Sequence, residues 1–316
     1  MNAIKWLPLG FALVLGLGFA EKSEAGMVYL GLGDSITFGQ DPSTPVSLTP
    51  SFADQGFVRP FANSLAGLNG GIRPTVLNLG VSGEQSTSFF SAVTTPASFG
   101  RAWQLNQNYP NSTTSQNALM LSSIDAIHAA GNSIGAVTFQ IGSNDINALT
   151  RSSAFQTASP ADQQRMIVAA IRSAETNFLT VLSELKAKAP EATLILPDNW
   201  NSFPLGTSAH AASDGFVRFA NQLIQADAQA YGAKFVDLYP LFLGRELQLT
   251  NLATGDTHPN QAGYAVIANA LSQSVVPEPS SLVLAAVGLG SLGVVRVVRA
   301  RQRDRRAVPS LLGYPH

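Results

Sequence analysis

The 316-residue sequence predicts one doubly wound α/β domain, because short apolar runs alternate along the chain with longer amphipathic segments. The short runs are typical of buried parallel strands, and they lie at 27–32, 75–79, 134–141, 192–196 and 234–238. The amphipathic segments indicate helices near 53–68, 117–130, 160–189, 210–231 and 260–274. Strands and helices in this alternation predict one parallel sheet with helices on both faces.

The segment 160–189 carries the clearest helix pattern. Ser159 suits the capping position, Pro160 suits the first turn, and Pro190 marks the end. Apolar side chains recur between them at steps of three and four residues, at Ile167, Ile171, Ala174, Phe178, Leu182 and Leu185.

Composition excludes several classes of function. Residues 26–276 carry 11 Lys and Arg residues against 16 Asp and Glu residues, whereas a nucleic-acid-binding domain needs a basic footprint. The chain has no cysteine, which excludes disulfides, thiolate catalysis and cysteine-ligated metals. His and carboxylate residues do not recur at metal-ligand spacing either. We therefore expect no nucleic-acid partner, no metal and no cofactor.

Residues 1–25 are typical of a secretory signal peptide. Lys5 precedes an apolar run at 6–20, and Ser23 and Ala25 supply small residues for cleavage. The run is short for a membrane-spanning helix. We expect export, with the mature protein beginning near residue 26.

Residues 276–306 form a three-part segment at the other end, followed by a tail at 307–316. A Pro-Glu-Pro break at 277–279 precedes an uncharged apolar stretch at 281–295, and six arginines then follow within 296–306. This order predicts a marginal transmembrane helix with a basic cytoplasmic stop. It resembles the PEP-CTERM sorting signal of Gram-negative bacteria. The resemblance implies processing by an exosortase-type enzyme, membrane contact before processing, and a final place at the cell surface or outside the cell.

The predicted strand ends suggest where a site would lie, because ligands of such sheets bind at the carboxyl ends of strands. Ser35 follows the first strand in a Gly-Asp-Ser-Ile turn, as a nucleophile would. His258 lies in a loop before the last helix and is the best general base. His210, at a helix start, is a reserve, and His128 fits a packing role within a helix.

These residues resemble the SGNH/GDSL hydrolase family over most of residues 27–274. Its blocks correspond to Gly33-Asp34-Ser35-Ile36, Asn78-Leu79-Gly80, Gly142-Ser143-Asn144-Asp145 and the loop ending His258-Pro259-Asn260. The resemblance implies a flavodoxin-like three-layer α/β/α sandwich with a five-stranded parallel sheet. It also implies Ser35 as nucleophile, His258 as base, and an oxyanion hole formed by the Ser35 and Gly80 N–H groups and the Asn144 amide. Asp145 would brace its loop.

The acid beside the histidine departs from the family pattern. In the family it usually precedes the histidine by three residues, where Gly255 stands here, whereas Asp256 lies two residues before His258. Asp256 is the expected acid. The alternative is a Ser-His dyad whose ring is oriented by a backbone carbonyl or by water.

The sequence thus predicts an exported esterase domain at 26–275 that forms an acyl-enzyme on Ser35. Its substrate would be an acylated polysaccharide or a small ester of the carboxylesterase or lipase type. A surface protein that binds glycan in the same cleft without catalysis is the alternative from another class.

Overall fold

The protein is described by a computed structural model that covers residues 26–42, 55–92, 108–109 and 113–275. The predicted signal peptide and the predicted C-terminal sorting segment lie outside these residues. No helix within the described ranges is long and apolar enough to cross a membrane.

The five predicted strands form one parallel sheet. They are β1 (Met27–Gly33), β2 (Thr75–Asn78), β3 (Ser133–Gln140), β4 (Thr193–Pro197) and β5 (Lys234–Val236). Their order in the sheet is β2-β1-β3-β4-β5, and every neighbouring pair is parallel. This is the flavodoxin-like order, so the predicted fold is confirmed.

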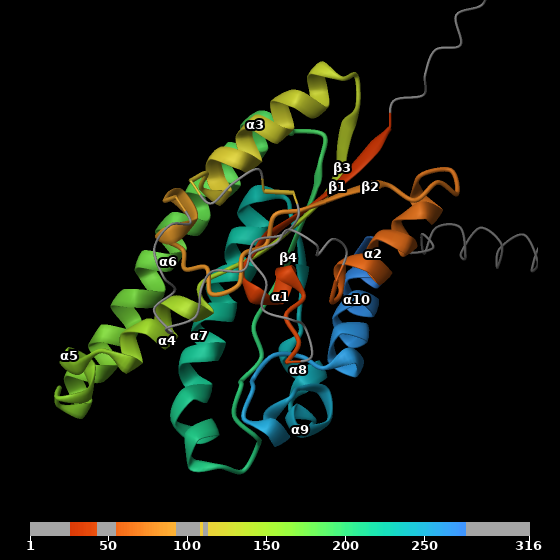
Figure 1. Ribbon diagram of the computed structural model, residues 1–316. Helices are drawn as coiled ribbons and strands as arrows, with labels where there is room; N and C mark the ends of the chain where they lie inside the picture. Colours follow the sequence, from red (N-terminus) through yellow and green to blue (C-terminus); the bar gives the residue numbers. More distant parts are fainter. Residues whose placement is uncertain (1–25, 43–54, 93–107, 110–112, 276–316) are drawn as a thin grey trace, which may run out of the picture.

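Helices cover both faces of the sheet, as the alternation predicts (Figure 1). One face packs against α2 (Val58–Leu65) and α10 (Gln261–Val275), and the other against α3 (Gln116–Ala129), α6 (Pro160–Lys188) and α7 (Ser208–Tyr231). Five shorter helices lie in the connections: α1 (Ser35–Phe38), α4 (Ser143–Arg151), α5 (Ser153–Gln156), α8 (Tyr239–Phe242) and α9 (Glu246–Leu249). Three 3₁₀ turns complete the described elements, at Ala66–Leu68, Ser88–Phe90 and Leu252–Thr254.

Successive side chains of β1 enter different cores, because side chains of a strand point alternately to its two faces. Tyr29 packs edge to face on Phe61 of α2, with ring centroids 5.1 Å apart. Leu30 and Leu32 lie in the opposite core, under α3 and α6. Both faces of the strand are therefore buried, which explains why the run in the sequence is continuously apolar.

The carboxyl ends of β1 and β3 meet at the point where the strand order reverses. Gly33 is the last residue of β1, and it pairs with Gln140 at the end of β3. Gly33 has a φ of +137°, and a Cβ at this position would lie 2.1 Å from the Gln140 carbonyl oxygen. Only glycine therefore lets the two strand ends come this close, immediately before Ser35.

A second close approach fixes the start of α10. A Cβ on Gly263 would lie 2.0 Å from the backbone oxygen of Leu249, which also accepts a hydrogen bond from the Asn260 N–H. We expect Gly263→Ala to destabilise the fold by about 2 kcal/mol, because the backbone must shift to admit the methyl group. Urea unfolding followed by circular dichroism measures the change.

Gly215→Ala is the matched control. Gly215 lies within α7, it is exposed, and nothing lies within 4 Å of a Cβ placed there. Alanine should stabilise this helix by up to ~1 kcal/mol. Equal stability of the Gly263→Ala protein and the unmodified protein would show that the contact with Leu249 relaxes freely.

Candidate active site

Ser35 stands on a turn that several buried side chains hold. Asp34 caps α1 by accepting the Ile36 N–H at 3.0 Å, and its side chain is buried. The Gln116 side chain binds both polar groups of the Gly33 backbone, accepting from its N–H at 2.7 Å and donating to its carbonyl at 2.9 Å. Asn78 donates to the Thr37 carbonyl at 2.9 Å. Ser35 thus begins a short helix whose position is set from β1, β2 and α3.

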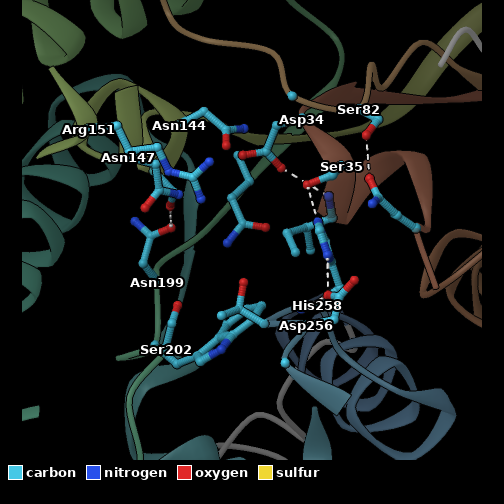
Figure 2. A pocket seen from close by; sticks show the side chains of 18 residues that line it. Asp34, Ser35, Ser82, Asn144, Asn147, Arg151, Asn199, Ser202, Asp256 and His258 are labelled. Atoms are coloured by element: carbon cyan, nitrogen blue, oxygen red, sulfur yellow. Dashed lines mark hydrogen bonds and ion pairs between the residues drawn. The ribbon is translucent and has the colours of Figure 1, made fainter. Parts of the chain in front are cut away.

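The loop before α10 brings His258 to Ser35. The His258 Nε2 atom lies 2.8 Å from Ser35 Oγ, and Nδ1 lies 2.5 Å from Asp256 Oδ1 (Figure 2). The same Asp256 oxygen accepts the His258 backbone N–H at 2.8 Å. A spacing of two residues therefore suffices for Asp256 to contact the ring. Serine, histidine and aspartate form one continuous chain of hydrogen bonds.

Asn144 approaches the same place from the start of α4, across the pocket from His258 (Figure 2). Its side-chain amide donates one hydrogen to the Glu84 carbonyl at 2.9 Å. A primary amide carries two hydrogens, so the second remains for a ligand. Asp145, the next residue, accepts the N–H and the hydroxyl of Ser86 at 2.9 and 2.7 Å. It therefore braces the loop after β2.

Gly80 does not lie where the sequence interpretation places it. Its N–H donates to the Asn78 side chain at 2.9 Å, and it is not among the residues that line the pocket. A Cβ on Gly80 would lie 2.5 Å from the Phe38 backbone nitrogen, so this glycine admits α1 against the end of β2. The Gly80 N–H is therefore already bonded in this structure, which argues against the expected oxyanion role of Gly80.

Gly83, three residues further on, lines the pocket instead. It has a φ of +84°, and within the described residues its N–H meets no acceptor. The sequence places two glycines in Gly-Val-Ser-Gly after the second strand, and only the path of the chain over the sheet edge distinguishes them.

The pocket has a volume of about 380 Å³, and its two sides differ. Ser35, Asp256 and His258 lie on one side, and Asn144, Asn147, Arg151 and Asn199 lie on the other (Figure 2). Asn144, Asn147 and Arg151 are three or four residues apart on α4, so they project from one helix face. Ser202 and Trp200, which follow β4, also line the pocket. Among the lining side chains, only Ile36 and Trp200 are mainly apolar.

Three buried carboxyl groups lie close together at the pocket: Asp34 lines it, whereas Glu84 and Asp145 do not. Burial raises the pKa of Asp34 to about 6 and that of Glu84 to about 8, and mutual repulsion with Asp145 adds to both shifts. Burial likewise raises the pKa of Asp145, although its bonds from Ser86 oppose the shift. Glu84 is therefore largely neutral at pH 7.

The other histidines of the described chain lie outside the pocket. His210 is buried on α7, with Nε2 3.8 Å from Asp214, and His128 pairs with Glu191 at 2.8 Å. Within the described ranges no three His, Cys, Asp or Glu side chains cluster as metal ligands.

A parallel α/β sandwich with a hydrogen-bonded serine, histidine and aspartate at its switch point is typical of serine hydrolases. The profile of the GDSL-like lipase/acylhydrolase family matches residues 32–266, about three quarters of the chain. The chain belongs to this family, and it is a hydrolase of ester bonds. The PEP-CTERM protein-sorting motif matches residues 275–302.

Solved structures with the same fold are distant in sequence. The lipase Lip_vut3 from a goat rumen metagenome is 16% identical, with a TM-score of 0.54 over 80% of this chain and 99% of that one. Axe2, an acetylxylan esterase from Geobacillus stearothermophilus, is also 16% identical, with a TM-score of 0.47 over 80% and 96% of the two chains. The comparison with curated protein sequences found no match.

Proposed function

We propose that the protein hydrolyses carboxylic esters through an acyl-enzyme on Ser35. The observation that carries the proposal is the chain of hydrogen bonds from Ser35 Oγ through the His258 ring to Asp256. His258 Nε2 removes the hydroxyl proton as Oγ attacks the ester carbonyl, and then gives that proton to the departing alcohol. Water hydrolyses the acyl-enzyme with His258 again as the base. Asp256 holds Nδ1 protonated and stabilises the imidazolium.

Three donors face the developing oxyanion in this proposal: the Ser35 N–H, the Gly83 N–H and the second hydrogen of the Asn144 amide. Gly83 replaces Gly80 because it lines the pocket and its N–H meets no acceptor within the described residues. The Ser35 N–H is likewise without an acceptor there, since it belongs to the first turn of α1. Donors of this kind are typically worth about 3 kcal/mol each in the transition state.

The far side of the pocket favours an acylated glycan as substrate. Asn147, Arg151, Asn199 and Ser202 present amide, guanidinium and hydroxyl groups where the alcohol half of the ester would lie. Such groups suit a leaving group that carries several hydroxyls.

A more lipophilic ester is the second candidate, and a different surface favours it. Three large apolar side chains are exposed in this part of the chain. Phe203 and Leu205, which follow Ser202 in the sequence, are 44% and 55% exposed, and Leu247 on α9 is 60% exposed. None of the three lines the pocket, but exposed apolar side chains of this kind would suit a longer acyl chain or alcohol. An ester panel from acetyl to long acyl, including acetylated sugars, separates the two candidates.

The two ends of the chain support a proposal on location. The PEP-CTERM motif, together with a predicted signal peptide at 1–25, favours export and processing by an exosortase-type enzyme in a Gram-negative bacterium. The hydrolase domain at 26–275 would then act in the cell envelope, at the cell surface or outside the cell. Membrane contact through the C-terminal segment would precede processing.

Replacing Ser35 by alanine should abolish hydrolysis of 4-nitrophenyl acetate and labelling by a fluorophosphonate, because both need Oγ. Ser82→Ala is the control, since this serine also lines the pocket but bonds to Gln40. Labelling of the unmodified protein but not of Ser35→Ala would support the esterase over a catalytically silent glycan-binding protein. Undiminished turnover by Ser35→Ala would refute the assignment.

Asp256→Asn should lower kcat by roughly 10⁴-fold, because an amide cannot hold the ring in the required tautomer. Steady-state kinetics at pH 7 measure the effect, with Asp125→Asn as control because Asp125 pairs with Lys188 on the surface. A near-normal rate would favour a Ser-His dyad instead.

Asn147→Leu tests the glycan substrate. We expect kcat/KM for an acetylated sugar to fall roughly five-fold relative to that for 4-nitrophenyl acetate, the loss of about one hydrogen bond. The ratio of the two values, measured in parallel, is the readout. An unchanged ratio, together with a preference for long acyl chains in the panel, would favour the lipophilic candidate.

A further inference from the structure

Glu84 connects the three proposed oxyanion donors, although it does not line the pocket itself. It directly follows Gly83 in the chain, so the two share a peptide bond. Its backbone carbonyl accepts from the Asn144 amide at 2.9 Å. Its side-chain Oε2 accepts from Gln116 Nε2 at 3.2 Å, and Gln116 holds Gly33 two residues before Ser35.

The surroundings of the Glu84 side chain suit a neutral acid and not a carboxylate. Glu84 is 1% exposed, and its side-chain partners within the described residues, Gln116 and Ser88, are both uncharged. The titratable groups that face it are Asp34 at the end of β1, Asp145 on α4, and the phenol of Tyr109. Two of these are acids, and the third is a buried phenol. None of them supplies a positive charge that would compensate an ionised Glu84.

The hydrogen bonds around Glu84 can also accommodate the acid proton. Ser88 Oγ makes a hydrogen bond with Glu84 Oε1, and it accepts a second one from the Gln85 N–H at 2.9 Å. It can also donate to the Gln85 carbonyl oxygen, which lies 3.1 Å away. Because the Ser88 hydroxyl can donate to the Gln85 carbonyl, a protonated Glu84 Oε1 can donate to Ser88 Oγ while Oε2 still accepts from Gln116. A glutamine at this position would reproduce the same pattern, with its amide toward Ser88 and its oxygen toward Gln116.

We propose that Glu84 is a positioning residue that, as an uncharged acid, holds the Ser35 turn, the Gly83 N–H and the Asn144 amide in one fixed arrangement around the oxyanion. The inference rests on the proposed function, because it assumes that these donors stabilise a transition state. Ionisation of Glu84 would place a third negative charge beside Asp34 and Asp145, behind the site where negative charge develops. Loss of its proton should therefore weaken catalysis.

The pH dependence gives the proposal its first test. The pKa of Glu84 is about 8, so the unmodified enzyme should lose kcat as the pH rises through this value. Glu84→Gln should keep kcat at pH 7 within about two-fold and lose this alkaline decline, because glutamine stays neutral. Glu191→Gln, a surface change beside His128, should leave the profile as it is in the unmodified protein. Initial rates on 4-nitrophenyl acetate between about pH 6 and pH 10 measure all three proteins.

Stability should follow the same titration. The folded-state pKa of Glu84 lies above its ordinary value of 4.5, so folding takes up a proton between pH 4.5 and about pH 8. Its contribution to stability is therefore complete below pH 4.5 and is lost as the pH rises to 8. The melting temperature of Glu84→Gln should accordingly rise relative to that of the unmodified protein over this range.

Glu84→Leu separates positioning from packing. Removal of both polar atoms releases Gln116, so kcat should fall by at least roughly ten-fold while KM changes little, as expected when a transition-state interaction is lost. If this variant does not fold, the glutamine variant alone decides. An alkaline decline that persists unchanged in Glu84→Gln would overturn the proposal. Turnover by Ser35→Ala in the same assay would overturn the proposed function instead, so the two failures are distinguishable.

Discussion

The hydrogen bond between His258 Nε2 and Ser35 Oγ joins residues 223 positions apart, and the rest of the structure serves to make it possible. Ser35 follows the first strand and His258 precedes the last helix, so neither local segment can bring the two together. The parallel sheet does so, because parallel strands leave all their carboxyl ends on one edge. The order β2-β1-β3-β4-β5 then places β1 between β2, which precedes the loop with Gly83, and β3, which precedes α4 and Asn144.

Buried polar side chains fix that edge of the sheet. Asp34, Asn78, Gln116 and Asp198 are each at most 2% exposed, and each binds backbone groups beyond its own residue. Asp198 accepts the Leu238 and Tyr239 N–H groups at 2.6 and 3.2 Å, and so joins the end of β4 to the chain after β5. Burial raises its pKa to about 8, even though these bonds oppose the shift. The buried Asp198 therefore lowers the free energy of unfolding by an amount that grows as the pH rises from 3.8 to about 8.

The sequence predicts most of this arrangement, and the omissions have a physical pattern. All five strands are visible because both of their faces are buried, and Ser35, Asn144 and His258 stand in motifs directly beside strands or the last helix. Helix α4 (Ser143–Arg151) is not among the predicted helices, because it spans only nine residues and carries only three apolar side chains, Ile146, Ala148 and Leu149. The sequence does not distinguish Gly80 from Gly83, because both follow the second strand. The roles of Glu84 and Gln116 depend on partners 32 to 83 residues away, which no local pattern encodes.

Without cysteine, the loop that carries His258 has no disulfide, and a set of hydrogen bonds holds it. Asn251 supplies much of this support, because its backbone N–H and its side chain both donate to the His258 carbonyl, at 3.0 and 3.1 Å. Thr250 pairs with Pro259 in an isolated antiparallel bridge, and Asn260 donates to the Thr250 carbonyl at 3.2 Å. The loop is thus closed on itself at its base, and Asp256, whose backbone N–H donates to the Asn251 carbonyl at 3.2 Å, lies beside the ring. One oxygen of the Asp256 carboxylate accepts hydrogen bonds both from the backbone N–H of His258 and from its Nδ1. The imidazole ring is therefore oriented even though the acid precedes the histidine by two residues and not by three. The two-residue spacing is therefore a compact solution to the same geometric requirement.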